Sequence, residues 1–142
     1  MRIRVINGPN LNMLGLREPE LYGHESYADL VAFVEQSAAA LGVQVECLQS
    51  NHEGEIVTWI QQSLGQADAI IINPAAYTHT SVAILDALLA VKLPAVEVHL
   101  SNVSAREDFR RVSYCAMACR KVIAGHGFAS YKMAMEFLTK KT

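Results

Sequence analysis

Polar side chains of the kinds that move protons and form hydrogen bonds follow four separate apolar runs in this chain. They are more numerous than loop solubility requires, and they combine amides, imidazoles, guanidinium groups and phenols. The groups that follow the four runs are Asn7, Asn10, Asn12, Arg17 and Tyr22, then 50–54, then 73–81, and finally 99–102 with Arg106 and Arg110. Such groups converge where a protein binds a small molecule and catalyses proton transfer on it. We therefore predict an active site built from these four segments.

The first of these segments is long for a connection between a strand and a helix. Such connections usually take about two to six residues, whereas here the whole stretch 8–23 precedes a capped helix. A long loop on a compact domain is more often functional than decorative. We predict that it forms one wall of the active site and a lid over it, at about residues 8–25.

Five short apolar runs alternate with amphipathic helices along the chain. The expected strands are 2–6, 43–48, 69–72, 95–98 and 121–124. All but the second are nearly continuous apolar runs, which is typical of a parallel sheet covered on both faces. We predict one α/β catalytic domain over 1–142, with a doubly wound five-stranded parallel sheet of flavodoxin-like order 2-1-3-4-5. In such a sheet, ligands bind outside the carboxyl ends of the strands, at the switch point between strands 1 and 3.

Capping residues mark several helix ends. Ser26 and Asp29 predict a capping box at the start of the first helix, and Gly42 predicts its end. Three later helices are expected near 55–64, 81–91 and 129–140. The buried face of the first of these is expected to include Leu64, and that of the second Leu89. Ser104 and Glu107 predict a second capping box, at the start of a short helix before the last one.

Size and charge exclude several kinds of partner. The 142 residues suffice for one domain with one substantial core, and 51% apolar against 18% charged residues argues against disorder. Twelve basic and fourteen acidic side chains give a net charge of −2, and no basic stripe indicates a nucleic-acid partner. No apolar run approaches the roughly 20 residues of a membrane helix, and no signal-peptide pattern opens the chain. We expect a cytoplasmic protein without nucleic-acid or membrane partners.

Three cysteines do not make an even disulfide framework. Cys115 and Cys119 lie one helical turn apart and could in principle share a metal, whereas Cys47 stands alone. No third or fourth ligand lies near them in the sequence, and no zinc-type spacing occurs. We interpret all three as thiols in a reducing compartment and expect no bound metal.

Five motifs along the chain carry a family resemblance. They are Gly8-Pro9-Asn10-Leu11-Asn12, Arg17-Glu18-Pro19-x-x-Tyr22-Gly23, Ser50-Asn51-x-Glu53-Gly54-Glu55, Asn73-Pro74-x-Ala76-Tyr77-Thr78-His79-Thr80-Ser81 and Glu97-Val98-His99-Leu100-Ser101-Asn102. Together they resemble type II 3-dehydroquinate dehydratase over the chain to about Ser113. The stretch 115–121 differs from the small apolar segment usual in the family, and Ala75 stands where the family usually has glycine.

The resemblance implies a hydro-lyase that reversibly dehydrates 3-dehydroquinate to 3-dehydroshikimate by anti elimination through an enolate, with no metal or organic cofactor. Tyr22, as tyrosinate, would take the proton beside the ketone, and Arg17 would supply the cation that favours the phenolate. Ionising a phenol with a pKa of about 10 at pH 7 costs roughly 4 kcal/mol. One cation at about 4 Å contributes a similar amount at an effective dielectric near 20. The attraction to the Arg17 cation is therefore large enough to offset the cost of ionising Tyr22.

The resemblance assigns the proton donor as well. His99 would protonate the departing hydroxyl, and Glu97, two residues earlier on the same face of a strand, is placed to orient it. Asn10 would lie near the enolate oxygen and act through a water. The substrate-holding positions would be Asn73, His79, Asp86, Leu100, Ser101 and Arg110, with the carboxylate received by the backbone of 100–101 and the Ser101 hydroxyl.

Asp86 carries an implication for assembly. It matches a residue that the family contributes to a neighbouring subunit's site. The resemblance therefore implies a trimer-based homo-oligomer, in the family a dodecamer of four trimers.

Several of these residues also have a purely structural interpretation. Asn10, Asn12 and Asn73 can shape turns, because asparagine bonds its own backbone. His79 can cap a helix, and Asp86 can lie on a solvated helix face. Arg106 fits a helix-surface cation and is not among the predicted site residues.

Two other classes of protein compete with an enzyme. A flavodoxin-like binding module would be a flavin carrier or a phospho-receiver, but a receiver needs acidic residues where this chain has Asn7 and Asn73. A flavin or dinucleotide site needs a phosphate loop that runs directly into a helix, and the loop after the first strand does not. A structural oligomer derived from a degenerate enzyme is opposed by the presence of Arg17, Tyr22 and His99.

Overall fold

The computed structural model describes residues 1–16 and 25–140, with the backbone alone at Ser104. Five parallel strands form one sheet in the order β2-β1-β3-β4-β5, as predicted. Each observed strand differs from its predicted range by at most one residue at either end. The strands are β1 (Arg2–Asn7), β2 (Gln44–Gln49), β3 (Ala69–Asn73), β4 (Ala95–His99) and β5 (Lys121–Ala124).

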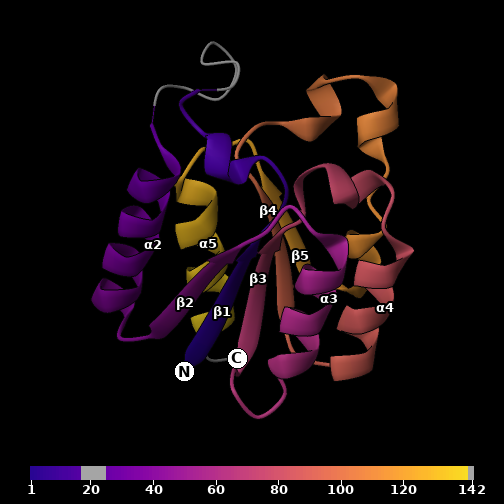
Figure 1. Cartoon of the computed structure of the whole chain (residues 1–142). Helices are drawn as coiled ribbons and strands as arrows, with labels where there is room; N and C mark the ends of the chain where they lie inside the picture. The colour runs from indigo at the N-terminus through magenta and orange to yellow at the C-terminus, as the bar shows by residue number, and fades with distance from the viewer. Residues whose placement is uncertain (17–24, 141–142) are drawn as a thin grey trace.

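Among the described residues, four α-helices cover the two faces of the sheet. Figure 1 shows α2 and α5 on one face and α3 and α4 on the other, so that two apolar layers enclose the sheet. Strands β3 and β4 are buried along their whole length, which explains why both are mostly apolar. The helices are α2 (Tyr27–Leu41), α3 (Glu53–Gln62), α4 (Val82–Val91) and α5 (Ala129–Thr139). Short 3₁₀ helices also lie in the described part of the chain: η1 (Leu11–Met13), η2 (Ala75–His79), η3 (Val103–Ala105), η4 (Asp108–Arg111) and η5 (Cys115–Ala118).

The first helix is capped as the sequence predicts. The Asp29 amide donates to the Ser26 hydroxyl at 3.1 Å, and the Ser26 amide donates to the Asp29 carboxylate at 2.9 Å. At the other end, Gly42 has φ 73° and donates its amide to the last turn. A residue with a side chain rarely adopts this backbone angle, so glycine fixes where α2 stops.

Two predicted core residues and one predicted cap are wrong. Helix α3 ends at Gln62, so Leu64 lies in the following turn and is 57% exposed. Helix α4 buries Ile84 and Leu88, and Leu89 lies on the outer face at 51% exposure. The capping box predicted from Ser104 and Glu107 does not occur, because the chain there forms η3 and η4 instead of one helix, and neither begins with a side-chain cap.

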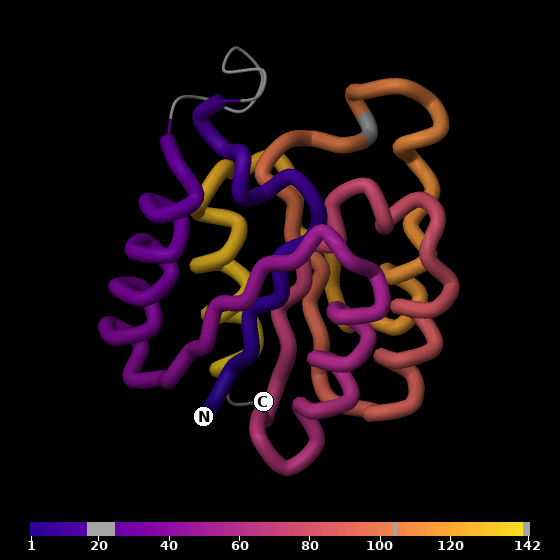
Figure 2. Tube along the Cα trace, viewed as in Figure 1, coloured from indigo at the N-terminus to yellow at the C-terminus, as the bar shows by residue number. Residues whose placement is uncertain are grey.

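The carboxyl ends of four strands meet at one edge of the sheet. Asn7, the last residue of β1, is in register with Gln49 of β2 and Asn73 of β3. Beside them, β4 ends at His99. Figures 1 and 2 show the segments after β1, β3 and β4 gathered at this end of the molecule. The fold therefore brings the polar segments found in the sequence to one place, at the predicted switch point.

Gly8 allows the first of these segments to pass against the third. Its amide donates to the Asn73 carbonyl oxygen at 2.8 Å. A Cβ atom on residue 8 would lie 2.6 Å from the Pro74 carbonyl oxygen and 2.8 Å from its carbonyl carbon. Because both neighbours are backbone atoms, no side-chain movement relieves the overlap. Glycine is required here by a close approach of two loops.

Gly8→Ala should therefore destabilise the fold. The loops must separate to admit the methyl group, which strains packing and weakens the hydrogen bond to Asn73, and we expect a loss of about 2–3 kcal/mol in the free energy of unfolding. Denaturant unfolding measures it. Gly54→Ala is the matched control, because a Cβ there meets nothing within 4 Å. A Gly8→Ala variant as stable as Gly54→Ala would contradict the close approach.

Candidate active site

A pocket opens at the carboxyl edge of the sheet. It holds about 750 Å³ of empty space, with open solvent at its mouth included. Most predicted site residues within the described chain line it: Asn10, Asn73, His79, His99, Leu100, Ser101 and Arg110. Arg17 and Tyr22, and with them residues 17–24 of the predicted lid, lie outside the described residues.

His99 and Glu97 form a short, buried pair at the end of β4. The His99 Nε2 and a Glu97 carboxylate oxygen are 2.6 Å apart, and only 1% of Glu97 is exposed. Because a carboxylate accepts, the proton in this contact lies on Nε2, and Nδ1 is the ring nitrogen left for the pocket. Residues i and i+2 share a face of a strand, which is how the sequence places one side chain beneath the other.

Glu97 stays charged because donors surround its carboxylate. Its second oxygen accepts from the Ser113 hydroxyl at 2.7 Å, and the Ser113 hydroxyl in turn accepts from the Ala116 amide at 3.0 Å. Burial raises the pKa of the Glu97 carboxyl, but hydrogen bonds from His99, Ser113 and Cys115 together with the charge of His99 outweigh it, so the pKa lies below its ordinary value of 4.5. An ionised carboxylate thus faces the imidazole.

On the other face of the sheet edge, Tyr131 holds the two strand-ending asparagines. This tyrosine of α5 is fully buried. Its hydroxyl donates to the Asn7 side-chain oxygen at 2.6 Å and accepts from the Asn73 side-chain nitrogen at 3.1 Å. Burial raises the pKa of Tyr131, so it remains a neutral phenol. The orientation of Asn73 in the pocket is therefore fixed from helix α5.

Tyr131→Phe should weaken both folding and substrate binding. The variant leaves two buried amide groups without their partner, which costs about 1–3 kcal/mol in the free energy of unfolding. Because Asn73 then keeps only the bond from the Ala75 amide, its side chain is held less firmly, and we expect KM to rise several-fold while kcat changes less. Denaturant unfolding and steady-state kinetics measure the two effects. An unchanged KM in a destabilised variant would show that Tyr131 does not position Asn73.

The described part of the first loop is held by strand β2 and the turn that follows it. The Asn10 amide donates to the Asn51 side-chain oxygen at 3.0 Å, and Gln49 donates to the Gly8 carbonyl oxygen at 3.1 Å. Asn10 has φ 70°, a conformation that asparagine tolerates better than most residues. Asn12 is exposed and contacts Gln49 at 3.3 Å. Asn10 thus both shapes the turn and lines the pocket, whereas Asn12 does not line it.

One histidine and two arginines also line the pocket. His79 Nδ1 lies 2.7 Å from the Val112 carbonyl oxygen, which places a proton on Nδ1. Arg110 pairs with Glu107 at 2.7 Å and also lines the pocket. Arg106, which the sequence analysis set aside as a surface cation, lines it too. The pocket therefore suits an anionic ligand.

The chain resembles known proteins along nearly its whole length. The family profile described as dehydroquinase class II matches residues 1–139. This chain belongs to the class II dehydroquinase family. The predicted resemblance is thereby confirmed, and the alternative interpretations as a flavin carrier or phospho-receiver are excluded.

Individual relatives agree with this family assignment. A 3-dehydroquinate dehydratase from Phenylobacterium zucineum is 55% identical over 134 residues, 94% of this chain and 92% of that protein. A catabolic 3-dehydroquinase from Verticillium alfalfae is 55% identical and covers 98% of this chain and 93% of its own length. The crystal structure of type II dehydroquinase from Butyrivibrio crossotus has a TM-score of 0.96 and 47% identity, with 99% and 98% of the two chains covered. As a class II dehydroquinase, the chain is an enzyme of the hydro-lyase class.

At Ala75, where the sequence departs from the family pattern, the backbone has an unusual conformation. Ala75, which stands where class II dehydroquinases usually have glycine, has φ 52°. Its amide donates to the Asn73 side-chain oxygen at 3.2 Å, so both ends of the Asn73 amide are held by the protein. Ala75 thus has a left-handed backbone conformation in this chain despite the strain that a methyl group adds there.

Within the described chain, Asp86 is a predicted site residue that neither lines the pocket nor, as Glu97 does, bonds to His99. It is exposed on α4 and is not among the residues that line the cavity. The structure therefore does not place it at the site of its own chain. No helix in the described chain combines the length and apolar character that a membrane crossing requires.

Sequence reasoning missed two groups that shape this dehydroquinase site. Ser113 supports Glu97 from 16 positions away, and Tyr131 joins Asn7 and Asn73 from the last helix. Tyr131 belongs to none of the five motifs. Its burial beside polar strand ends is the signal, and only the packed structure shows it.

Proposed function

We propose that the chain converts 3-dehydroquinate to 3-dehydroshikimate by anti elimination, with Tyr22 as the base and His99 as the acid. The buried pair of His99 and Glu97 at the pocket carries the proposal. The motif that contains Arg17 and Tyr22 lies on the loop whose described part forms the opposite wall. The family assignment supplies the substrate.

The elimination runs in two steps through an enolate. First, the Tyr22 phenolate takes a proton from the carbon beside the ketone, and the electron pair of that C–H bond moves into the enolate. The enolate then re-forms the ketone, its electrons make the carbon–carbon double bond, and the carbon–oxygen bond of the hydroxyl breaks. His99 gives its proton to the departing hydroxyl. One water is lost, and proton exchange with solvent resets both groups.

The surroundings of His99 support its role as the acid. The adjacent Glu97 carboxylate stabilises an imidazolium, and its contact with Nε2 leaves Nδ1 to reach the leaving group. Ser113 holds the other carboxylate oxygen, so Glu97 cannot turn away freely. Glu97 is thus a positioning residue for the proton donor.

The remaining contacts would hold the substrate against these groups. We assign the substrate carboxylate to the backbone of Leu100 and Ser101 and the Ser101 hydroxyl. We assign the ring hydroxyls to Asn73, His79 and Arg110, which line the pocket. Asn10, on the first loop, would stabilise the enolate oxygen through a water. Residues 8–25 would close over the bound substrate as a lid.

We also propose that the enzyme works as a trimer-based oligomer, up to a dodecamer of four trimers. The exposed position of Asp86 on α4 supports this assembly, since it does not line the pocket of its own chain. In a trimer it would reach the substrate of a neighbour. Gel filtration with light scattering tests the assembly, and a fully active monomer would refute the shared site.

Direct assay tests the proposed reaction. Mixing the protein with 3-dehydroquinate should produce the ultraviolet absorbance of a conjugated enone, because dehydration places the new double bond beside a carbonyl group. The rate should be unchanged after dialysis against a chelator, since no step uses a metal. Absence of the enone signal would refute the reaction, and loss of activity on dialysis would refute the metal-free mechanism.

A further inference from the structure

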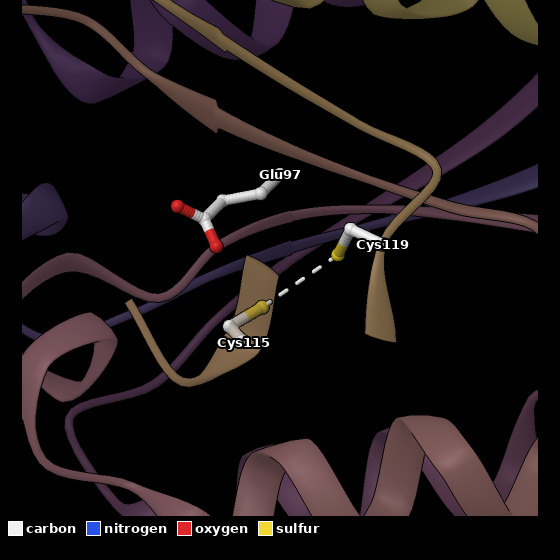
Figure 3. Close-up of side chains that lie close together, drawn as sticks. All are labelled: Glu97, Cys115 and Cys119. Carbon is white, nitrogen blue, oxygen red and sulfur yellow. Dashed lines mark hydrogen bonds between the residues drawn. The ribbon is translucent and has the colours of Figure 1, made fainter. Parts of the chain in front are cut away.

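Two thiols and a carboxylate meet directly behind the active site. Figure 3 shows Cys115 and Cys119 side by side, with an oxygen of Glu97 directed toward them. We propose that these three residues form a binding site for a thiophilic divalent cation such as Zn²⁺, and that its occupancy inhibits the enzyme. The cation site itself is independent of the proposed function, whereas the inhibition rests on the proposed role of Glu97.

Chain topology brings the third ligand to the two cysteines. Cys115 begins η5, Cys119 follows it, and the chain then enters β5, which pairs with β4 at Glu97 and Val122. The carboxylate thus reaches the thiols from a strand that precedes them by 18 positions. This is the ligand that sequence spacing alone does not reveal.

The separations of the ligand atoms suit a tetrahedral ion. Two sulfurs at 2.3 Å from such an ion lie about 3.8 Å apart, and the Cys115 and Cys119 sulfurs are 3.8 Å apart. All three ligand atoms lie within 4.8 Å of one another. Any three such atoms share a point within 4.8/√3, or about 2.8 Å, of each. Movements of well under 1 Å therefore bring them to the usual zinc distances.

The two thiols and the carboxylate together favour a soft cation. Two sulfur ligands favour zinc or cadmium over magnesium or calcium, which prefer oxygen. Cysteine binds a metal as the thiolate, so two thiolates would offset the charge of one divalent cation at this site.

The site is accessible from one side. Cys119 is half-buried, whereas Cys115 and Glu97 are each 1% exposed. The ion would enter past Cys119, and the Ser113 hydroxyl or a water would complete its coordination, since Ser113 already contacts the Glu97 carboxylate at 2.7 Å. A catalytically competent protein can therefore take up the ion without unfolding.

A cation bound at this site should impair His99 as the proton donor. A carboxylate that coordinates a cation shares its negative charge with the metal and is drawn toward it. The same carboxylate holds His99 at 2.6 Å. We therefore expect Zn²⁺ to lower kcat several-fold and to change KM much less, because the substrate-holding residues are untouched.

Binding is tested first, on reduced protein without substrate. Titration with Cd²⁺ should give a sulfur-to-metal charge-transfer band that saturates at one ion per chain. Cys119→Ser should weaken binding by more than tenfold, and Cys47→Ser should leave it unchanged, because Cys47 stands elsewhere in the fold on β2. A Cys119→Ser variant that binds Cd²⁺ as tightly as the wild type, or a band that disappears in Cys47→Ser, would overturn the site.

Activity is tested separately with Zn²⁺ and the enone assay. Wild type and Cys47→Ser should be inhibited, a chelator should restore their rate, and Cys119→Ser should resist inhibition. Equal inhibition of Cys119→Ser and wild type would refute inhibition through this site. A saturated Cd²⁺ band with no effect of Zn²⁺ on rate would keep the cation site but reject the role of Glu97. An absent band in an active enzyme would reject the site and keep the function.

Discussion

Tyr22→Phe should lower kcat by about 10³-fold, within the range that general base catalysis contributes. The phenylalanine has the same shape but cannot take a proton, so the protein should still fold and bind substrate. The enone assay gives kcat, and calorimetric titration with a non-reacting substrate analogue gives binding. Retention of most of the wild-type rate would mean that another group is the base.

The described tyrosines beside the strand ends are unsuited to that role. Burial raises the pKa of Tyr131 and of Tyr27, which contacts Asn7, so neither is ready to become a phenolate. Tyr114→Phe is the matched control, because Tyr114 is half-buried and is not among the described residues that line the pocket. We expect that control to keep its rate. A loss in both variants would indicate a general structural effect.

The sheet could be predicted because its interior strands are continuous apolar runs between well-marked helix ends. The predicted strands stop too early at the positions that matter most for function. Asn7, Asn73 and His99 are polar, so they end the apolar pattern, yet all three belong to their strands. Backbone pairing continues through them, as the register of Asn7 with Asn73 shows. The apolar pattern of these strands ends before their backbone pairing does.

The pair of Glu97 and His99 was predictable because its members share one strand face. Contacts that depend on packing were not. Asn73 meets Tyr131 across 58 positions of sequence, and nothing in the local pattern distinguishes this buried tyrosine from others in the core. Similarly, the two cysteines predicted as plain thiols lie against Glu97 only because β4 and β5 are neighbours. Spacing along the chain cannot report such contacts.

Glu97→Gln should lower kcat by about 10²-fold with little change in KM. The glutamine oxygen can still accept from His99, and its amide nitrogen can donate to the Ser113 hydroxyl, so the geometry is retained while the charge is lost. The rate loss then reports the electrostatic support that the carboxylate gives to the imidazolium. Glu46→Gln is the control, since Glu46 is an exposed glutamate that pairs with Arg4 at 3.2 Å, outside the pocket. Equal rates in the two variants would contradict the role of Glu97.

The same variant should alter stability in acid. The pKa of Glu97 is lowered in the folded chain, so its ionised form stabilises the fold above the ordinary value of 4.5. That contribution is lost as the pH falls through the lowered value. Glutamine does not titrate, so the gap in unfolding free energy between wild type and Glu97→Gln should narrow below pH 4.5. A gap that stays constant from pH 7 to pH 3 would show that folding does not lower the pKa of Glu97.

A double-mutant cycle separates positioning from independent action. His99→Ala removes the acid itself and should lower kcat by about 10²–10⁴-fold. If Glu97 acts only through His99, then adding Glu97→Gln to His99→Ala should reduce kcat little further, because groups that work as a unit are strongly non-additive. If the loss of kcat in the double variant instead equals the product of the two single losses, then Glu97 contributes to the elimination by another route. The 2.6 Å contact between the buried carboxylate and the imidazole predicts the first result.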